Sequence, residues 1–554
     1  MVLKRGCTVG GSPIDPATGA AFALAGRVVT MDGARRVVDD GVVFGVNGSI
    51  ADVRAVGDGV PVGFEDVRVI ASGGTIYPGL IELHNHLPYD VLGLWSVPRQ
   101  FANRDQWSGP STPDYHRLIT GPMQVLGKDP ALVAAVVRYV ELRCLLGGTT
   151  TSQGVTLASA SGIIKHFRGL VRNVESTGDP DLPPAVTHIA DVDASDAEKF
   201  RERISSGKKM ILHLAEGADT DDAAHNHFAA LQFKPGEWAI TENLIGIHCA
   251  ALHADDFAVL AANHGSMVWS PLSNLLLYGK TANIGAALAH QVPVALGSDW
   301  APSGSKNLLG ELKVARLTAE FRGVDVSDAD LVAMATRNPA AMVGWGAHIG
   351  SLEAGKRADL IVVDGKTGDP YSRLVDATEA AVYLVMINGV PRAGITRVMT
   401  ELGVPATAPN VRVGEHTCLL NLEQATADPD VDLVSADEAI ARLRQALHDL
   451  PGQPAGTAMA VAAPGVRLAV AGLVDNQESP RHHLPLNGQL TGPNLPPTRT
   501  VAAARTAVSI AGPLPSLTLD PLTAVDNPAF YDTLADEPNV PPPIKQGLAR
   551  YRRS

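Results

Sequence analysis

Two histidines separated by one residue, His84 and His86, have a spacing that could bind a metal. They follow a short apolar run, residues 80–83, which begins behind Pro78-Gly79 and is typical of a buried strand. Alternate side chains of a strand share a face, so both imidazoles point the same way. Two imidazoles at one strand end can supply two nitrogen ligands to a divalent metal. Two histidines satisfied by ordinary hydrogen bonds would have the same spacing, so the pair alone does not decide.

The same tripeptide occurs again as His225-Asn226-His227, in a different setting. It follows Asp221-Asp222 and lies among alanines, a composition typical of a helix with acids at its N-terminus. At positions i and i+2 of a helix the two rings diverge. We therefore interpret this second pair as structural or as part of the surface.

Three further polar residues end apolar, strand-like runs later in the chain. The runs are residues 210–212, 244–247 and 294–298, and the residues that end them are His213, His248 and Asp299. In a parallel barrel the carboxyl ends of the strands meet at one rim, so these side chains would converge with His84 and His86. Three imidazoles and one carboxylate are a suitable ligand set for zinc or iron.

The elements that must position these residues alternate between strand-like and helix-like between residues 76 and 345. A helical pattern at 131–146 leads into Gly147-Gly148, and each strand-like run is followed by a loop and a helical pattern. Repeated β-then-α units predict an α/β fold with a parallel sheet, and a (β/α)8 TIM barrel is the commonest closed form. We therefore predict a barrel over residues 76–345.

Segments rich in short β-type runs flank this alternation on both sides. Gly and Asp turns separate such runs in residues 22–75, and the same texture returns in residues 346–400, where Asn388-Gly389 is a hairpin signal. We predict that the two flanks together form one small β-sandwich domain.

Residues 401–554 have a different, Ala-, Pro- and Gly-rich character, and we predict an irregular extension of unknown role. Residues 435–450 are an amphipathic helix with Ser435 as N-cap and Glu438 three residues on. Residues 529–532 could anchor the extension on the barrel or on a neighbouring subunit. His482-His483 we interpret as a solvated pair rather than as ligands.

The bulk properties favour a small-molecule partner. A formal net charge of −13 over 554 residues, without a basic run, argues against nucleic acid and against an anionic membrane. The first residues lack the apolar stretch of a secretory signal, and the apolar segment 458–474 is interrupted by Pro464 and Arg467. We therefore expect a cytoplasmic protein. Its four cysteines are far apart and indicate neither a disulfide framework nor a thiolate zinc site.

Several motifs together carry a family resemblance. They are residues 78–86, the unit from His213 to Glu216, His248, residues 270–274, Gly297-Ser298-Asp299 and residues 350–360. As a set they resemble the amidohydrolase superfamily, in the branch of guanine, cytosine and S-adenosylhomocysteine deaminases and triazine hydrolases. The resemblance covers about residues 22–400.

The resemblance implies one divalent metal held by four residues, zinc first and iron(II) as the alternative. The implied ligands are His84, His86, His213 and Asp299. His248 would be either a further ligand or a neighbour that hydrogen-bonds the reacting water or the developing oxyanion. Asp299 would accept the proton of the attacking water. Glu216 would carry that proton to a ring nitrogen and then to the leaving group, unless it is an exposed loop carboxylate.

Dinuclear members of the superfamily use a carboxylated lysine at a strand end, for which Lys165 is the only candidate. The His-x-x-Glu unit belongs to the mononuclear branch, so we expect one metal and a structural Lys165. Substrate contacts are expected from the long loop 87–123 and from the turn after Asp299. The residues named for this role are Tyr89, Trp107 and Ser303, although each aromatic could equally serve packing.

The function expected from the resemblance is hydrolysis of a non-peptide C–N bond, by removal of ammonia from a cyclic amidine. Two other outcomes stay open: opening of a cyclic amide, as in imidazolonepropionase-like relatives, and loss of a substituent from a triazine-like ring. A scaffold without catalysis is a third, but it would have no reason to keep Glu216 beside His213. Relatives often form dimers, which suggests a homodimer.

Overall fold

The structure is a computed structural model that describes most of the chain. It covers residues 18–108, 112–160, 162–167, 169–188, 197–424, 431, 434–452, 458–460, 506–508 and 513–552. Cys7, His482, His483 and most of the apolar segment 458–474 lie outside these residues. No helix within the described residues is both long and apolar enough to cross a membrane.

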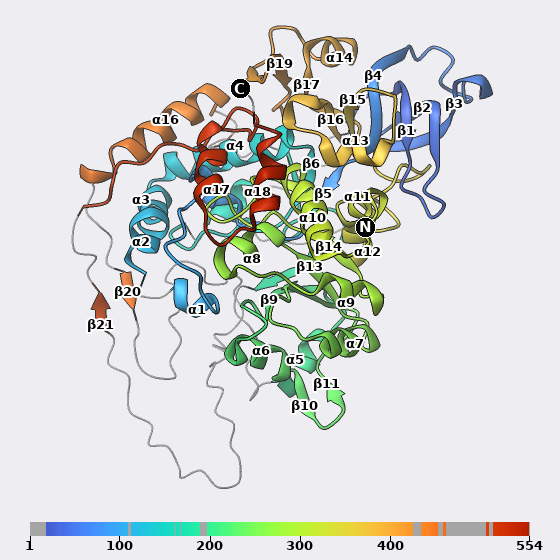
Figure 1. The fold of residues 1–554 in the computed structure, drawn as a ribbon. Helices are drawn as coiled ribbons and strands as arrows, with labels where there is room; N and C mark the ends of the chain where they lie inside the picture. The colour runs from blue at the N-terminus through green and yellow to red at the C-terminus, as the bar shows by residue number, and fades with distance from the viewer. Residues whose placement is uncertain are drawn as a thin grey trace, which may run out of the picture.

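Eight parallel strands in two sheets lie at the centre of the molecule (Figure 1). One sheet has three strands in the order β5 (Leu80–Ile81), β6 (Thr149–Ser152) and β7 (Arg172–Asn173). The other has five, in the order β14 (Val294–Leu296), β13 (Ser266–Trp269), β12 (Leu244–His248), β9 (Met210–Leu214) and β8 (Val186–His188). The predicted parallel strands at 210–214 and 244–248 are confirmed.

Backbone hydrogen bonds join the two sheets at both of their borders. Asp299 N donates to His84 O at 3.0 Å, just beyond β14 and β5. Ala185 N donates to Val174 O at 2.8 Å, between β7 and β8. The eight strands therefore follow one another in chain order around the centre. The described pairing is nevertheless that of two sheets, so the closed (β/α)8 barrel stays a prediction.

Helices surround these strands. They are α3 (Gly121–Lys128), α4 (Pro130–Leu146), α5 (Ala197–Ile204), α6 (Asp222–Ala229), α7 (Ala254–Ala262), α8 (Pro271–Tyr278), α9 (Ile284–Ala289), α10 (Leu308–Arg322), α11 (Asp328–Met334) and α12 (Arg337–Met342). The predicted helix at 131–146 is confirmed as α4, where Asp129 caps the first turn and Pro130 occupies its first position. The short helices α1 (Arg104–Trp107) and α2 (Pro113–Tyr115) lie in the long loop behind His86.

The two flanks of the chain contribute to one nine-stranded sheet. Its order is β18 (Asn410–Val413), β19 (His416–Leu420), β17 (Val390–Ile395), β16 (Val382–Ile387), β15 (Leu360–Asp364), β4 (Val69–Pro78), β1 (Phe22–Val29), β2 (Val37–Val46) and β3 (Ser49–Ala55). The central pairing joins β4 to β15 across the barrel sequence. The described residues form a single sheet here, so the sandwich form is not confirmed and the predicted domain boundaries stay predictions. The short helix α14 (Thr396–Glu401) lies against it, and α13 (Pro370–Asp376) packs on α10 and α11.

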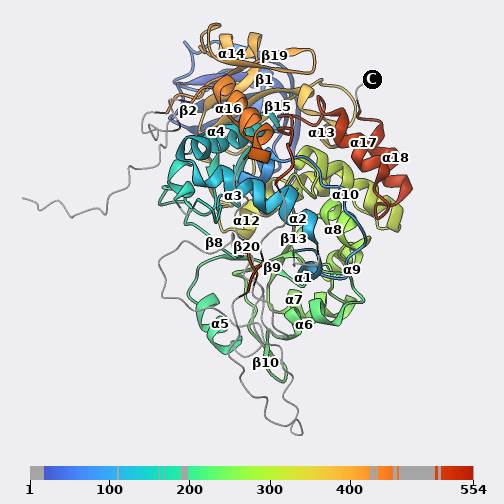
Figure 2. The ribbon, with the colours of Figure 1, turned by 90° about the vertical axis from the view of Figure 1, so that its left-hand side faces the viewer.

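The C-terminal part packs on the outside of the barrel helices (Figures 1 and 2). The predicted amphipathic helix is confirmed as α16 (Ala436–His448), with the Ser435 hydroxyl accepting from Glu438 N at 3.2 Å, and it lies against α4. Helices α17 (Pro528–Asp536) and α18 (Pro542–Ala549) follow, and α18 packs on α10. Phe530 and Tyr531 are buried, which confirms the anchor expected at residues 529–532.

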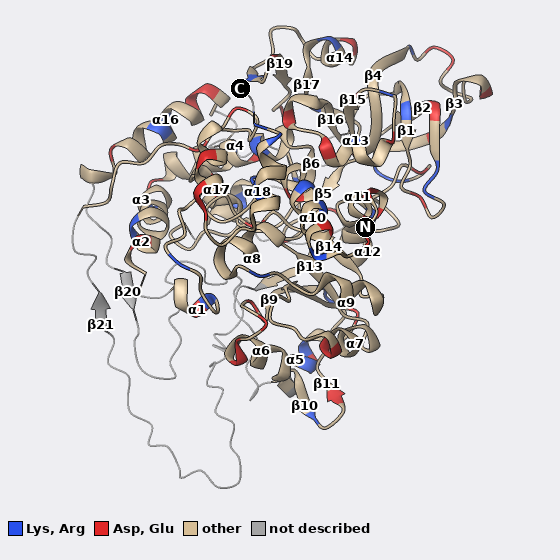
Figure 3. Cartoon of the chain, in the orientation of Figure 1, with Lys and Arg blue, Asp and Glu red and all other residues tan. Residues whose placement is uncertain are grey.

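Acidic and basic residues are interspersed along the described helices and strands (Figure 3). Two small hairpins complete the structure: β10 (Gln232–Lys234) with β11 (Glu237–Trp238), and β20 (Ala458–Ala460) with β21 (Thr506–Val508).

Candidate metal centre and active site

Five predicted site residues from four strand ends lie together at the carboxyl end of the parallel strands. The His84 ring centroid is 5.3 Å from that of His86, 4.9 Å from His213 and 4.8 Å from His248. The Asp299 carboxylate reaches the same point from beyond β14. All five side chains are buried or nearly so. The convergence that the strand pattern predicted is therefore present in the structure.

The donor atoms of this cluster have the spacing of a metal site. Nε2 of His84 is 3.2 Å and Nε2 of His86 is 3.6 Å from Asp299 Oδ1. Ligands about 2.0–2.1 Å from a tetrahedral zinc lie about 3.3–3.5 Å apart, so these distances fit. The potential donor atoms of His84, His213 and His248 also lie within 4.8 Å of one another. Asp299 Oδ1 is buried and accepts no hydrogen bond from the described residues, which leaves it available to a cation.

The backbone turns sharply where the chain delivers these side chains. Ala215, His248 and Asp299 all have positive φ angles, of 50°, 67° and 57°. Residues other than glycine adopt this conformation at a cost, and such residues concentrate at functional sites. At Asp299 the turn is fixed by the backbone bond to His84, so the carboxylate and the first histidine are held by the same contact.

Burial favours the neutral form of His86, His213 and His248. It lowers the pKa of His86 to about 4 and those of His213 and His248 well below the ordinary value. Burial would raise the pKa of Asp299, but the neighbouring His84 and His86 outweigh it and hold that pKa well below the usual range. Neutral imidazoles with an ionised carboxylate are the protonation states that bind a metal.

A serine hydroxyl donates a hydrogen bond to the second oxygen of the Asp299 carboxylate. Ser273, on α8, donates to Asp299 Oδ2 at 2.6 Å, and its Oγ lies 3.3 Å from Ser303 Oγ. The Ser303 hydroxyl in turn accepts from Trp300 Nε1 at 2.6 Å and is fully buried. This geometry suits a Ser303 that holds Trp300 and Ser273 in place. Its predicted contact with substrate is not tested and stays a prediction.

Hydrogen bonds behind His248 define which of its nitrogens carries the proton. Trp269 Nε1, which can only donate, bonds to Thr281 Oγ1 at 2.8 Å. The Thr281 hydroxyl therefore donates its own hydrogen to Asn274 Oδ1, 3.1 Å away. With its oxygen bound there, Asn274 turns its NH2 group toward His248 Nδ1, at 2.9 Å. The neutral His248 ring then accepts at Nδ1 and carries its hydrogen on Nε2, which faces the cluster.

The Glu216 carboxylate lies on the same rim, buried at 4% exposure. Its Oε1 accepts from the Tyr278 hydroxyl at 2.7 Å and is 3.8 Å from His248 Nε2. Arg104 Nη1 is 3.8 Å from Oε2. The structure thus excludes the alternative of an exposed loop carboxylate, and it brings Glu216 next to the histidine cluster.

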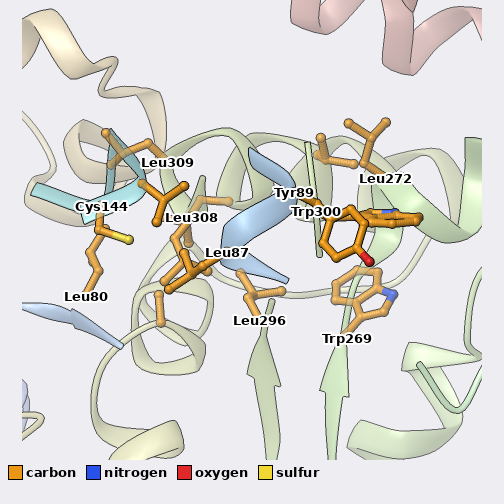
Figure 4. Packing of buried hydrophobic residues seen from close by; sticks show 14 of the residues in the cluster. Leu80, Leu87, Tyr89, Cys144, Trp269, Leu272, Leu296, Trp300, Leu308 and Leu309 are labelled. Atoms are coloured by element: carbon orange, nitrogen blue, oxygen red, sulfur yellow. The ribbon is translucent and has the colours of Figure 1, made fainter. Parts of the chain in front are cut away.

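Aromatic rings, which we call the aromatic cover, pack beside the cluster next to His86. Trp300 lies 5.6 Å from His86, 5.2 Å from Tyr89 and 6.0 Å from Trp107, measured between ring centroids. Figure 4 shows Tyr89 and Trp300 packed together above Trp269. Two of the three predicted substrate contacts, Tyr89 and Trp107, therefore line this aromatic cover.

The family resemblance included residues 270–274 as a motif but gave Ser273 and Asn274 no role. They lie on α8, as does Tyr278, which the sequence analysis missed; α8 follows β13, a strand that the sequence analysis did not recognise. Arg104 was also missed, because the loop offers Arg99 and Arg117 as well and nothing in the sequence ranks the three. A recognised strand at 266–269 would have drawn attention to Tyr278 on the next helix.

Two other groups lie apart from this centre. Lys165 is exposed on a short 3-10 helix (Ile163–His166) rather than at a strand end, so the structure gives it no place as a bridging ligand. His225, His253 and Asp256 form a second cluster on α6 and α7. There His225 Nε2 already bonds to Asp256 at 2.8 Å and His253 Nε2 to Asp219 O at 3.2 Å, which is ordinary surface hydrogen bonding.

A comparison with protein families identifies the chain. The model of the Amidohydrolase family matches residues 75–392, more than half of the 554 residues, and the match includes every residue of the cluster. The chain belongs to the amidohydrolase family. The predicted resemblance is therefore confirmed, and with it the prediction of a hydrolase that acts on C–N bonds other than peptide bonds.

The relatives of this amidohydrolase include deaminases and a triazine-ring hydrolase. The 5-methylthioadenosine/S-adenosylhomocysteine deaminase of Symbiobacterium thermophilum is 25% identical over 390 residues, which span 62% of this chain and 84% of that protein. The zinc-bound adenosine deaminase of Xanthomonas campestris has a TM-score of 0.56 at 21% identity, over 78% of this chain and 100% of that one.

A variant of the atrazine chlorohydrolase of Arthrobacter aurescens, complexed with zinc, has a TM-score of 0.53 at 20% identity, over 67% of this chain and 94% of that one. At these identities the structural neighbours show a TIM-barrel type of fold. Zinc in both structures, together with the His and Asp cluster, supports a divalent metal in this amidohydrolase. A cytoplasmic location and a homodimer stay predictions.

Proposed function

We propose that this amidohydrolase binds one divalent metal through His84, His86, His213 and Asp299, with zinc as the first choice and iron(II) as the alternative. The 3.2 Å and 3.6 Å spacings of the donor atoms support the site. The neutral imidazoles and the Asp299 oxygen without a hydrogen bond support it as well. A divalent metal at such a site activates water for attack near neutral pH.

His248 acts in this proposal as a hydrogen-bond donor and not as a ligand. Asn274 occupies Nδ1 of the ring, so Nε2 presents an N–H group to the cluster. Such a donor stabilises the negative charge that develops on an oxygen during attack at a carbon. Of the two roles that the family resemblance left open for His248, the proposal therefore takes the hydrogen-bonding neighbour rather than the ligand.

Glu216 and Asp299 divide the movement of protons. Asp299 accepts a proton from the attacking water, while Ser273 keeps its Oδ2 oriented. Water supplies two protons: Glu216 passes one to a ring nitrogen and carries the other, taken up by Asp299, to the amino group, which leaves as ammonia while the carbon keeps the oxygen as a carbonyl. The observation that carries the proposal is the place of Glu216: buried, oriented by Tyr278, and 3.8 Å from the His248 nitrogen.

The proposed substrate is a planar nitrogen heterocycle with an exocyclic amino group, which leaves as ammonia. Tyr89, Trp107 and Trp300 form the aromatic cover, and a flat substrate ring could stack on their faces. The names of the deaminase relatives support ammonia as the leaving group. The aromatic cover would also accept a triazine-type ring. We propose this as the second candidate substrate, supported by the name of the chlorohydrolase neighbour.

The fold proposed for this function is a closed (β/α)8 barrel. Its support is the order of the eight parallel strands and the backbone hydrogen bonds at both borders between the two sheets. A closed barrel brings β5 and β14 together, and it is there that the first histidine pair and Asp299 meet.

An ammonia-release screen tests the proposal. Zinc-loaded protein is offered aminated purines and their nucleosides, aminated pyrimidines, pterins and triazines, and ammonia is measured. We expect release from one of these classes, and a loss of about 10²–10⁴-fold in kcat for Glu216→Gln, which keeps the shape but cannot carry a proton. Turnover without ammonia would favour loss of another substituent or opening of a cyclic amide. No turnover in any class would contradict the proposal.

A further inference from the structure

The C-terminal segment before α17 buries one carboxylate, that of Asp520, against α4 and the segment that follows Asp299. Asp520 is 5% exposed, and its Oδ2 accepts from Arg143 Nη1 at 2.7 Å and from Lys306 Nζ at 2.5 Å. Its Oδ1 accepts from Asn527 at 2.9 Å. Both cations are also buried, at 4% exposure. A buried cation needs a counter-charge and hydrogen bonds, so Asp520 is tightly constrained here.

The two cations belong to the walls of the candidate active site. Lys306 lies seven residues beyond Asp299, with a positive φ of 76°. Arg143, on α4, donates to Asp90 O at 2.7 Å and to Lys306 O at 3.3 Å. Asp90 belongs to the 3-10 helix Leu87–Val91, which begins directly after His86. Asp520 therefore contacts the two cations that belong to, or are bound to, the segments following His86 and Asp299, two of the proposed ligands.

Backbone contacts of the same segment reinforce this placement. Asp520 N donates to Val91 O at 3.1 Å, and Asp520 O accepts from the Tyr139 hydroxyl. Phe530 lies 5.2 Å from Lys306 Nζ and covers it from the other side. Asn539 donates to Leu276 O on α8 at 2.7 Å, so a third wall of the site is also in contact with the C-terminal part.

A further carboxylate in this cluster is a poorer counter-ion. Asp90 Oδ1 accepts from Ala301 N at 2.8 Å, which ties the two loops to each other. Burial raises the pKa of Asp90 to about 7, so near neutral pH it is only partly ionised. If Asp520 were absent, the two buried cations, Arg143 and Lys306, would have only the partly ionised Asp90 as a counter-ion.

We infer that Asp520 is a positioning residue of the active site: it is the buried counter-ion that fixes loops 87–91 and 299–307, behind His86 and Asp299. The C-terminal extension is then part of the active-site wall. This inference rests on the proposed function for its catalytic consequence, but its structural consequence can be measured separately. The aromatic cover is held through the same loops, because Tyr89 and Trp300 lie on them.

The test uses the full-length protein and two matched variants. Asp520→Asn keeps the shape and removes the charge. Asp376→Asn is the control, because Asp376 also ties the C-terminal part to the helices around the parallel strands, through Tyr551 at 2.6 Å and Arg316, and its hydrogen bonds within the described residues reach neither loop. Hydrogen–deuterium exchange of the metal-free protein is followed in peptides over 87–97, 299–307 and 360–364. The zinc dissociation constant is then measured by competition with a chromogenic chelator.

For Asp520→Asn we expect faster exchange in 87–97 and 299–307 only, and zinc affinity reduced about tenfold. The double variant Asp520→Asn/Lys306→Met removes one excess positive charge, and we expect it to recover most of the loss. Exchange and affinity equal to those of Asp376→Asn, or faster exchange spread evenly over the barrel, would overturn the inference. If Asp520→Asn does not fold, Lys306→Met alone is compared with Asp376→Asn by the same criteria. A wild-type protein that binds neither zinc nor iron(II) would refute the proposed function, while the exchange result would still decide the role of Asp520.

Discussion

Asn274 is the residue that fixes which nitrogen of His248 carries the hydrogen. Its amide donates to Nδ1, and the bonds through Thr281 to Trp269 fix the orientation of that amide. The orientation of the His248 ring hydrogen is therefore specified by three side chains that lie behind the ring. None of the three is charged, and although residues 270–274 carry the family resemblance, nothing in the sequence links Asn274 to His248.

Replacing Asn274 by Asp should convert His248 from a donor at Nε2 to a charged or differently protonated ring. A carboxylate beside Nδ1 attracts a hydrogen to that atom, which raises the pKa of the ring. We expect kcat to fall about 10²-fold, while the metal content stays that of the wild type. Steady-state kinetics on the substrate class that releases ammonia, with metal analysis of the same sample, measures both. Loss of the metal with kcat per bound metal unchanged would mean that His248 is a ligand.

The convergence of the five side chains of the cluster could be predicted, because the strand rule locates them, while their roles stay predictions. His84, His86, His213, His248 and Asp299 each end an apolar run, and parallel strands bring such ends together. The residues around them were not predictable in the same way. Ser273, Asn274 and Tyr278 act through hydrogen bonds whose partners are distant in sequence, and only the folded chain brings them together.

Among the elements, the loop after β6 packs against the His84–His86 segment and holds it in place. Gln153 Oε1 accepts from Asn85 N at 3.0 Å, and Gly154 N donates to Glu175 at 2.7 Å. Gly154 has a φ of +88°, and a Cβ there would be 1.7 Å from Asn85 O and 3.2 Å from His86 Cα. The glycine is therefore required twice, by its backbone conformation and by the space.

A paired glycine experiment separates these two requirements. Gly154→Ala must both strain the backbone and push Asn85 and His86 away. Gly207→Ala has a similar φ of +85° but meets nothing within 4 Å, so it should cost only the strain, about 1 kcal/mol. We expect Gly154→Ala to be the more destabilised by urea unfolding and to hold less zinc. Equal stability and equal zinc content in the two variants would show that the loop does not support the histidine segment.

The strands of this region show where sequence reasoning fails at the scale of elements. β6 is Thr-Thr-Thr-Ser, β-branched but polar, and β7 has two residues, so neither has an apolar run. The same reasoning found β9 and β12, which are five residues long and mostly apolar. A strand buried between neighbours on both sides can be polar or short when its neighbours supply the hydrogen bonds.

At the scale of the whole molecule, buried carboxyl groups make folding stability depend on pH. Glu311 on α10 is fully buried and accepts from Leu272 N at 3.1 Å, and burial raises its pKa to about 8 from 4.5. Between these values the unfolded chain has lost the proton that the folded chain keeps. The contribution of this group to stability is thus present below pH 4.5 and is lost as pH rises toward 8.

Glu311→Gln removes this dependence, since the amide does not titrate. The stability of the variant relative to the wild type should rise by about 1.4 kcal/mol for each pH unit between about 4.5 and 8, and then level off. Urea unfolding of both proteins at four pH values measures the difference. Glu320→Gln, on an exposed turn of the same helix, is the control and should give a constant difference. A constant difference for Glu311→Gln as well would show that Glu311 is ionised in the fold.

The C-terminal part was the least predictable at this scale. Its amphipathic helix and aromatic anchor could be read from periodicity and residue type. The contact of Asp520 with Arg143 and Lys306 could not, because a lone aspartate in a Pro- and Leu-rich stretch has no periodic context.

The most direct test of a mononuclear metal-dependent amidohydrolase is the metal content of the protein, purified without chelators or a metal-binding tag. Mass spectrometry of the digested protein gives the number of metal ions for each chain, and Asp299→Ala is analysed beside the wild type. We predict about one zinc or iron per wild-type chain and a large loss in the folded variant. A folded wild-type protein without metal, or one with two metal ions per chain, would contradict this account.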